Sequence, residues 1–377
     1  MGLKNFCGRC WVEVNLGALR ENALALKRLA GASCGLLAVV KSNAYGHGAR
    51  EVCQTIADLV ECFGVASVEE ARELVVFGRD IMLLSPCLPC ERPEAVEAGW
   101  IPTVSSANEA ASYAKIGRCR VNFKIDTGMG RLGCDPTEAE REISALAAIS
   151  ELSVYSISTH MPVADEDDEF SVFQLEKFWG LRERLERLVP EARWHVLNSA
   201  GLMKYQGSAM DLVRCGLALY GIAYPGEFQG LLCPVLTWKA RILMTKWLPE
   251  GASVSYGRTF IAPSRMRVAS LSVGYGDGYP RQASGRGACV LVGGQRRPIL
   301  GRVTMDQIMV DVGGLDVEPG DEVVLIGGQA GERILASELA SWSDTIAWNI
   351  FTGISSRVKR IYFLRDDQTA LNTRSDR

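Results

Sequence analysis

The chain has 377 residues, of which 47% are hydrophobic and 23% charged, and its formal net charge is −3. This length suits two domains better than one, and the near-balanced charge argues against a nucleic-acid-binding surface. No apolar run reaches the roughly 18 residues that a membrane-spanning helix needs. The N-terminal MGLKNFCGRCWVEV lacks the apolar stretch of a secretory signal. We therefore expect a cytoplasmic protein that binds neither nucleic acid nor membrane.

Twelve cysteines raise the question of a metal site or a disulfide framework. Two pairs, Cys7/Cys10 and Cys87/Cys90, have CxxC spacing, but about 80 residues separate the pairs, far outside the spacing of common zinc modules. The other cysteines stand singly. We interpret them as reduced thiols that fill the core and predict no metal site, with a structural zinc and a disulfide framework as weaker alternatives.

From residue 11 to 234, short apolar runs alternate with amphipathic helical patterns such as REVCQTIADLV (50–60). The apolar runs are GLLAVVK (35–41), CFGVAS (62–67), DIMLLSP (80–86), IPTVSS (101–106), VNFKID (121–126), LSVYSISTH (152–160), HVLNSA (195–200) and MDLVRCGLALYG (210–221). This alternation predicts a parallel sheet covered by helices. About eight such units in about 230 residues favour a (β/α)8 barrel. A doubly wound open sheet is the alternative.

The pattern changes over residues 235–364. Short strand-like runs, among them LTWKARILMTKW, ASVSYGRTF and DEVVLIGG, are separated by Gly, Pro and Asp, and VGGQR (292–296) is typical of a hairpin turn. One weak helical pattern, ILASELASW (334–342), interrupts them. We therefore predict a second, mostly β domain. The polar tail over 365–377 is expected to be disordered.

Polar residues follow the predicted barrel strands at their C-terminal ends, where the reactive groups of such barrels lie. Lys41 ends the first apolar run directly; taken alone, it could simply reach solvent. Further along the chain stand Lys124, Asp126, Arg131, His160, His195, Asn198, Ser199, Arg214 and Gly216. Each polar side chain costs free energy to bury without a partner. Their convergence on one face of the barrel therefore predicts a functional site.

The residue types at this face indicate a particular cofactor chemistry. A desolvated lysine at a strand end is a candidate for a covalent bond to a carbonyl carbon. Tyr45, Ser199 and the backbone amides near Gly216 are neutral donors that suit a phosphate. A lysine beside a phosphate site in a barrel suggests pyridoxal 5′-phosphate, which serves as an electron sink for amino-acid Cα carbanions.

Seven motifs extend this interpretation into a family resemblance. The motif AVVKSNAYGHGA around Lys41 is similar to the cofactor-lysine signature of the alanine racemase family. KIDTGMGRLG, NSAG, RCGLALYG, SVSYGRTF, GYGDGYPR and GRVTMDQIMVDV also match, in order and at fitting intervals. The resemblance runs from about Trp11 to Tyr362. It implies a pyridoxal-phosphate enzyme with a barrel domain and a β domain.

The resemblance implies a two-base mechanism. Lys41 would carry the cofactor and act as the base specific for the D-enantiomer, and Tyr256 as the base specific for the L-enantiomer. Two groups are needed because racemisation removes a proton from one face of Cα and delivers one to the other. A free tyrosine has a pKa of about 10, so Tyr256 needs a cation to act near neutrality. Arg214, linked through His160, could supply it.

Other roles follow from the same resemblance. Arg214 would donate to the pyridine nitrogen of the cofactor, with His160 and His195 holding it in place. Arg131 would contact the substrate carboxylate or the phenolic oxygen of the cofactor. Many family members carbamylate the lysine that corresponds to Lys124, which orients this arginine; an ordinary lysine paired with a carboxylate is the alternative. Further cofactor contacts are implied for Tyr45, Asn198, Ser199, Gly216, Leu217 and Ser356.

The resemblance also implies that each active site is built from two chains. Met305 and Asp306 would line the substrate pocket, with the Met305 backbone near the substrate carboxylate. Together with Tyr256 they would reach the site of the other subunit, which implies a homodimer. Ser356 stands where some relatives have a tyrosine at the substrate entrance. A smaller side chain there would leave a roomier entrance.

The implied activity is interconversion of L- and D-alanine, supplying D-alanine for peptidoglycan. Because of Ser356, a serine or broad-specificity amino-acid racemase is an alternative. A non-catalytic pyridoxal-phosphate carrier would resemble the barrel alone and would lack the β domain. A decarboxylase of the same two-domain plan would offer a different constellation in place of SVSYGRTF.

Overall fold

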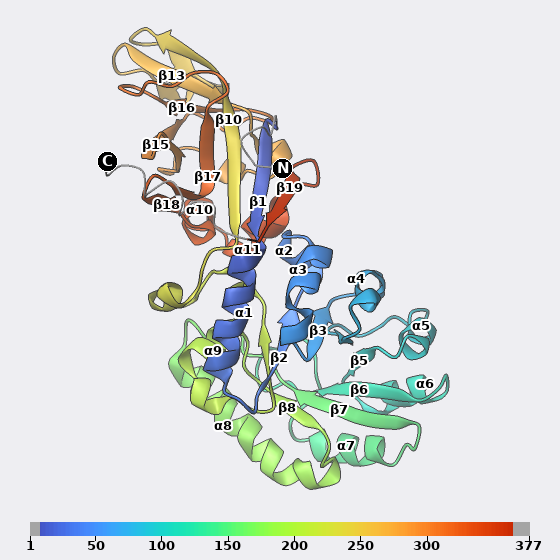
Figure 1. The fold of residues 1–377 in the computed structure, drawn as a ribbon. Coiled ribbons are helices and arrows are strands. Elements are labelled where there is room, and N and C mark those ends of the chain that lie inside the picture. Colours follow the sequence, from blue (N-terminus) through green and yellow to red (C-terminus); the bar gives the residue numbers. More distant parts are fainter. Residues whose placement is uncertain (1–7, 365–377) are drawn as a thin grey trace, which may run out of the picture. The chain divides into compact units, whose positions relative to one another are not determined.

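The computed structural model describes residues 8–364, which form two compact units (Figure 1). One unit comprises residues 19–44 and 48–233, and we call it the barrel unit. The other comprises residues 8–18, 45–47 and 234–364, and we call it the β unit. The predicted tail over 365–377 and the N-terminal Cys7 lie outside the described residues.

The barrel unit contains one parallel eight-stranded sheet in the order β8-β7-β6-β5-β4-β3-β2-β9. Its strands are β2 (Gly35–Val39), β3 (Cys62–Val65), β4 (Asp80–Leu83), β5 (Ile101–Val104), β6 (Cys119–Lys124), β7 (Leu152–Ser158), β8 (Arg193–His195) and β9 (Leu212–Cys215). The amide of Asp211 donates to the carbonyl of Trp194, and the amide of Arg214 to that of Leu197. These bonds join the two ends of the sheet. The predicted (β/α)8 barrel is confirmed, and the open-sheet alternative is excluded.

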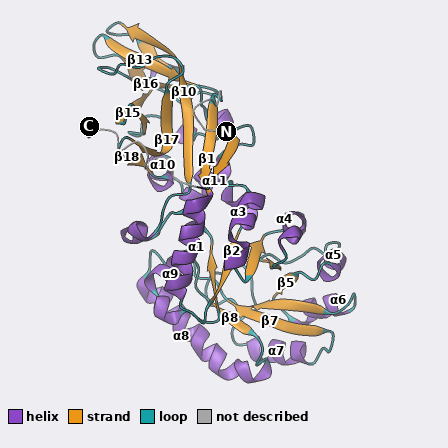
Figure 2. Ribbon diagram, viewed as in Figure 1, coloured by secondary structure: helices purple, strands orange, loops and turns teal. Residues whose placement is uncertain are grey.

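Helices surround the barrel strands (Figure 2). They are α1 (Leu16–Ala30), α3 (Ala49–Ile56), α4 (Val68–Leu74), α5 (Arg92–Glu97), α6 (Ala107–Ala114), α7 (Ala139–Ala147), α8 (Asp168–Leu185) and α9 (Ser199–Lys204). Several begin at a side-chain cap: the oxygens of Ser67, Ser106 and Asp167 accept the backbone N–H three residues on. Each cap satisfies a free backbone N–H at a helix N-terminus and so fixes the residue at which the helix begins.

The β unit is built around a nine-stranded sheet in the order β18-β17-β14-β15-β16-β13-β10-β1-β19. Its strands are β1 (Cys10–Asn15), β10 (Leu236–Leu248), β13 (Met266–Leu271), β14 (Cys289–Val292), β15 (Gln295–Leu300), β16 (Ile308–Asp311), β17 (Glu322–Gln329), β18 (Glu332–Ile334) and β19 (Lys359–Phe363). Because β17 also pairs with β10, the strands from β10 to β17 close a ring. Closure removes exposed strand edges.

Shorter elements complete the β unit. The strands β11 (Ser253–Val254) and β12 (Phe260–Ile261) pair with each other, and α10 (Ala336–Trp342) occupies the predicted weak helix. A second helix, α11 (Ala347–Gly353), has no counterpart in the prediction. Its seven residues include β-branched and aromatic side chains, so propensity gives it little signal.

The first strand lies outside the barrel. Our expected barrel domain begins at residue 11, whereas β1 pairs antiparallel with β10 and parallel with β19 in the β unit. The physical reason is that β2 already has two parallel partners, β3 and β9, so the barrel closes without β1. The sequence CWVEVN is compatible with a strand, but its pattern does not indicate which of the two sheets the strand joins.

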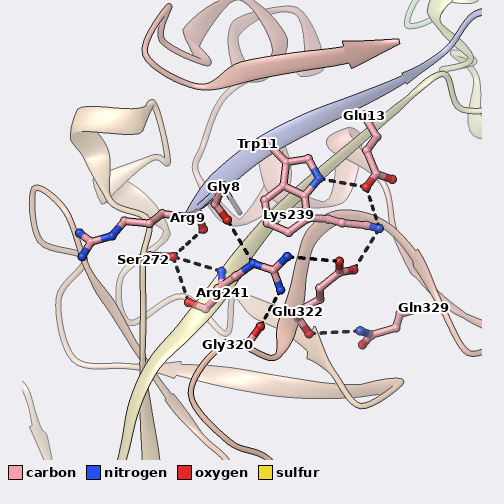
Figure 3. Close-up of polar contacts among 10 residues, drawn as sticks. All are labelled: Gly8, Arg9, Trp11, Glu13, Lys239, Arg241, Ser272, Gly320, Glu322 and Gln329. Carbon is pink, nitrogen blue, oxygen red and sulfur yellow. Dashed lines mark hydrogen bonds and ion pairs between the residues drawn. The ribbon is translucent and has the colours of Figure 1, made fainter. Parts of the chain in front are cut away.

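A buried ion pair ties β1 to its neighbours (Figure 3). The ammonium of Lys239 lies 2.9 Å from Oε1 of Glu13 and 3.2 Å from Oε2 of Glu322. Trp11 donates from Nε1 to the same Glu13 oxygen at 2.9 Å. The side chains of Glu13 and Lys239 are only 5% and 12% exposed. Three strands therefore share one charge cluster, in which the buried charges of Glu13 and Lys239 depend on each other.

Two further features concern the described part of the chain. Within residues 8–364, no helix combines the length and the apolarity required to span a bilayer. Eleven cysteines in this range are free, most of them buried, and burial raises the pKa of thiols such as Cys34 to about 11. Such thiols act as small apolar core residues.

Candidate active site

The C-terminal ends of the barrel strands carry the predicted polar residues. Lys41 follows β2, Lys124 ends β6, His160 follows β7, His195 ends β8 and Arg214 lies in β9. Because all eight strands are parallel, these ends meet on one face of the barrel. The structure thus gathers residues that are more than 170 positions apart in the sequence.

Arg214 is 5% exposed and contacts residues at the ends of β7 and β8. Its Nη1 lies 2.8 Å from Nδ1 of His195 and donates to the His195 carbonyl at 3.0 Å. Its Nη2 donates to the carbonyls of Thr159 at 2.7 Å and Val196 at 2.9 Å, and lies 3.4 Å from Nδ1 of His160. The guanidinium is therefore held by carbonyls and imidazoles and fixed in orientation.

Both histidines are neutral in this setting. Burial, and then the positive charge of Arg214, lower the pKa of His160 and of His195 well below the usual value. A guanidinium N–H can only donate, so Nδ1 of His195 accepts and its proton lies on Nε2. Nε2 of His195 is buried and has no hydrogen-bond partner within residues 8–364.

The pKa values of both lysines at this face are shifted toward the neutral amine. Burial, followed by the charge of Arg131, lowers the pKa of Lys41, while Glu70 raises it. Burial, followed by the charges of Arg214 and Arg131, lowers the pKa of Lys124 well below the usual value. Burial also lowers the pKa of Arg214 to about 10, so it stays protonated near neutrality. A neutral lysine amine is a nucleophile and a base, which an ammonium is not.

The chain leaves Lys41 in a left-handed turn. Ser42, Asn43, Ala44 and Tyr45 have φ between 52° and 54°, a conformation that residues with a Cβ rarely adopt. Each such residue costs roughly 1–2 kcal/mol. Such strain persists only where the surroundings over-determine it, and it clusters at functional sites. The turn places the lysine at an abrupt end of β2.

The segment after this turn belongs to the β unit. Tyr45 is buried, and its carbonyl lies 3.0 Å from Nδ1 of His47. A Cβ on Gly46, which has φ +78°, would come 2.5 Å from the carbonyl oxygen of Phe351. Arg360 donates to the Gly46 carbonyl at 3.1 Å. The glycines of the AYGHG motif therefore permit close backbone contact with α11 and β19.

A set of hydroxyl and amide groups follows β8 and β9. Oγ of Ser199 accepts from the amides of Gly216 at 3.0 Å and Ala218 at 3.3 Å, and Leu217 lies between them. Asn198 caps α9 by accepting from the amide of Gly201 at 2.8 Å. The predicted residues Asn198, Ser199, Gly216 and Leu217 thus come together, as donors of the kind that a phosphate uses.

Arg131 lies in the glycine-rich turn after β6 and is exposed in the single chain. Oδ1 of Asp126 accepts from the amides of Gly128 at 2.9 Å and Met129 at 2.8 Å, which shapes the turn. Gly133, with φ +120°, would bring a Cβ to 2.6 Å from the amide nitrogen of Asp126. The turn thus places a guanidinium close enough to lower the pKa of Lys41 and of Lys124.

The remaining predicted site residues lie in the β unit. Tyr256 follows β11 in a turn that includes Ser255 at φ 63° and Gly257 at φ 74°, and its side chain is 72% exposed. Met305 is 54% exposed, and its carbonyl accepts from the amide of Gly276 at 2.8 Å. Ser356 is also exposed. All three side chains are therefore accessible to solvent in the β unit.

Arg357 was not singled out in the sequence, although it organises this part of the β unit. Its Nη2 donates to Oδ1 of Asp306 at 2.7 Å, and its Nε donates to Oδ1 of Asp277 at 2.8 Å. The other carboxylate oxygen of Asp277 accepts from the amide of Gly274 at 2.9 Å. No local sequence pattern indicates this role, because Asp306 and Asp277 lie 51 and 80 positions away from Arg357.

The barrel face fits pyridoxal 5′-phosphate. Lys41, Lys124, Arg131 and Arg214 crowd together, and each arginine lowers the pKa of a neighbouring lysine. The positive charges of the two arginines, and the basic lysines beside them, favour a negatively charged partner. A phosphate and a phenolate oxygen would provide it, an amine is available for the carbonyl carbon, and Arg214 offers an N–H to a ring nitrogen. The donor set therefore accommodates every polar part of this cofactor.

Comparison with known proteins agrees with this fit. Residues 14–224 match the model of the alanine racemase N-terminal domain, and residues 235–362 match that of the alanine racemase C-terminal domain. Alanine racemases from Symbiobacterium thermophilum and Methylacidiphilum infernorum are 42% and 40% identical to this chain. The matches cover 93% and 94% of this chain and 96% and 92% of the relatives.

Solved structures agree as well. The alanine racemase of Streptomyces lavendulae has a TM-score of 0.88 and 36% identity, covering 95% of this chain and 98% of that one. The alanine racemase of Bartonella henselae, solved with covalently bound pyridoxal phosphate, has a TM-score of 0.85 and 28% identity, covering 94% and 100%. From the two domain matches, the identities and the site geometry together, it follows that the chain belongs to the alanine racemase family.

Proposed function

We propose that Lys41 and Tyr256 are the two bases with which this enzyme moves the Cα proton of alanine. The enzyme interconverts L- and D-alanine and depends on pyridoxal 5′-phosphate, as its family does. When bound, the cofactor supplies the electron sink that makes the Cα proton removable. The observation that carries the assignment of Lys41 is its lowered pKa at the end of β2, which favours the neutral amine that a base requires.

Arg214 would hold the ring nitrogen of the cofactor without giving up a proton. Even with its pKa lowered to about 10, it remains a cation near neutrality, so it donates a hydrogen bond there and nothing more. Neutral His160 and His195 would keep it oriented. Asn198, Ser199, Gly216, Leu217, Tyr45 and Ser356 would position the phosphate.

Arg131 would orient the substrate carboxylate or the phenolic oxygen of the cofactor through its planar fork. We propose that Lys124 is carbamylated and that the added carboxylate pairs with Arg131. Two features support this: burial lowers the pKa of Lys124 and favours a nucleophilic neutral amine, and the charge of Arg131 also contributes to that lowering. Met305 and Asp306 would line the substrate pocket, with Arg357 fixing the Asp306 carboxylate.

The catalytic unit would be a homodimer in which Tyr256, Met305 and Asp306 complete the site of the partner subunit. The exposure of Tyr256 and Met305 in the single chain supports this arrangement, because a partner surface would cover them. We further propose that the enzyme works in the cytoplasm and supplies D-alanine for peptidoglycan. Core thiols such as Cys53 and Cys62 suit a reducing compartment.

Mixing two inactive variants tests the shared site. Lys41→Ala and Tyr256→Phe, each inactive alone, are unfolded together, refolded as a mixture and assayed for D-alanine. If Lys41 of one chain works with Tyr256 of the other, a mixed dimer regains one intact site. An equal mixture then recovers about a quarter of wild-type activity, since half of the dimers are mixed. If both bases belong to the same chain, the mixture stays inactive and the dimeric site is wrong.

A further inference from the structure

A carboxylate outside the assigned site braces the turn that follows Lys41. Oε1 of Glu70 accepts from the backbone amide of Ser42 at 2.6 Å, and its Oε2 accepts from the amide of Ala66 at 2.8 Å. Ser42 comes directly after Lys41, and Ala66 directly after β3. One side chain therefore joins the C-terminal ends of two neighbouring parallel strands.

The left-handed turn depends on such external bonds. Inside the turn, the amide of Ala44 donates to the carbonyl of Val40 at 2.8 Å. Asn43 makes two bonds to residues that follow the turn. Its backbone carbonyl accepts from the amide of Gly48 at 3.0 Å, and its side-chain Oδ1 accepts from the amide of Ala49 at 2.7 Å. The amide next to Lys41, that of Ser42, is bonded to Glu70 instead. Glu70 is thus the brace nearest the reactive lysine.

The position of Glu70 is itself well defined. It lies in the first turn of α4, and its backbone amide donates to Oγ of the capping Ser67 at 3.4 Å. Val68, Ala71 and Leu74 bury the inner face of the same helix. Strands β2 and β3, whose ends the carboxylate joins, are paired along their length. The brace therefore connects rigid elements, which is what a well-placed reactive group requires.

Glu70 also acts on Lys41 through its charge. The negative charge of Glu70 raises the pKa of Lys41, whereas the positive charge of Arg131 lowers it. A cavity of about 530 Å³, lined in part by Ser42, Asn43, Glu70 and Glu73, opens beside it. Water can therefore reach the site, and a neutral side chain at position 70 leaves no buried charge unpaired. A Glu70 variant is expected to fold for this reason.

We propose that Glu70 is a positioning residue that holds the left-handed turn and thereby fixes the place of the Lys41 amine at the end of β2. The proposal rests on the proposed role of Lys41 as a base. Glu70 touches neither cofactor nor substrate in this account and works through the Ser42 amide.

Amide hydrogen exchange of the holoenzyme, followed by mass spectrometry, tests the brace directly. In Glu70→Gln, the amides of Ser42 and Ala66 are expected to exchange about tenfold faster, because a side-chain amide offers one acceptor where the carboxylate offers two. We expect kcat to fall about tenfold with KM nearly unchanged, because the lysine is misplaced and the substrate is still bound. Glu73→Gln, an exposed change on the same helix, is the matched control and should alter neither quantity.

Glu70→Asp keeps the charge but shortens the side chain by one methylene, so it cannot reach both amides. It should also speed exchange at Ser42, and it takes the place of Glu70→Gln if that variant does not fold. Unchanged exchange, or faster exchange with wild-type kcat, would overturn the proposal. The exchange result does not require Lys41 to be catalytic. Racemisation by Lys41→Ala would refute the proposed function separately.

Discussion

Nη1 of Arg214 and Nδ1 of His195 lie 2.8 Å apart inside the barrel unit, with the arginine as donor. This contact sets the tautomer of a fully buried histidine. Burial, and then the charge of Arg214, keep His195 and His160 uncharged by lowering the pKa of each. A buried guanidinium surrounded by neutral acceptors is an unusual partner for a cofactor ring nitrogen. In the proposed arrangement it would hold the ring and keep its own proton.

Arg214→Lys is expected to lower both stability and rate. Lysine has three donors on one atom and cannot replace two guanidinium nitrogens that serve the carbonyls of Thr159, His195 and Val196. Buried carbonyls left unpaired cost about 1–3 kcal/mol each, so we expect a loss of roughly 2–4 kcal/mol in the free energy of unfolding. We expect kcat to fall about a hundredfold.

Urea unfolding and initial rates measure these two effects. Arg193→Lys, a half-exposed arginine at the other end of the barrel strands, serves as the control and should retain kcat. A wild-type rate in Arg214→Lys would show that the guanidinium geometry is not needed.

The two barrel histidines should make the enzyme less stable in mild acid. Their folded-state pKa values lie well below 6.5, so below that pH the unfolded chain binds protons that the folded chain does not. Their contribution is fully present above about pH 6.5 and is lost as the pH falls, by about 1.4 kcal/mol per histidine for each pH unit. Thermal unfolding between pH 7 and pH 5 measures this slope. In His160→Gln the slope should be about half as steep, whereas an unchanged slope would mean that His160 is not buried as a neutral group.

Glu13→Gln should destabilise the β unit. It removes one partner from the buried ammonium of Lys239 and leaves Glu322 as the remaining carboxylate. Removing one partner of a buried ion pair lowers the free energy of unfolding by about 3 kcal/mol. Glu332→Gln, which breaks the exposed pair with Arg296, should cost less than about 1 kcal/mol. Equal losses in urea unfolding would argue that the Glu13 pair contributes no more than a surface contact.

Lys124 should carry a carbamate. Its lowered pKa leaves a neutral amine able to react with dissolved carbon dioxide, and the product pairs a negative charge with Arg131. In ¹³C-bicarbonate, we expect one carbamate resonance in the wild-type NMR spectrum that is missing from Lys124→Gln. The variant should also lose kcat by about tenfold, because Arg131 loses its partner. Identical spectra would contradict the modification.

The sequence predicts the barrel and its reactive face well, because both depend on local patterns. Alternating strands and helices indicate the fold class, and the polar residues at strand ends predict where the chemistry takes place. Lys41 became a candidate only together with the polar residues at the other strand ends, because its position alone also fits a lysine that reaches solvent. The motif SVSYGRTF suggested Tyr256 as a base only through resemblance to a family.

Features that depend on distant partners could not be predicted. Strand β1 reads like any half-buried strand, and nothing in it specifies that β10 and β19 are its neighbours. The left-handed turn after Lys41 contains no glycine until Gly46, so composition gave no sign of positive φ. Glu70 and Arg357 were not singled out in the sequence, because Ser42 and Asp277, which they contact, lie 28 and 80 positions away.

The most direct test of the two-base account is exchange of the alanine Cα hydrogen in D₂O, followed by NMR, in Tyr256→Phe. With Lys41 intact, the variant should exchange the Cα hydrogen of D-alanine, leave that of L-alanine in place, and produce no racemisation. This result would assign one face of Cα to each residue. Exchange of both enantiomers at wild-type rates would show that Tyr256 is not a base, and the two-base account would be wrong.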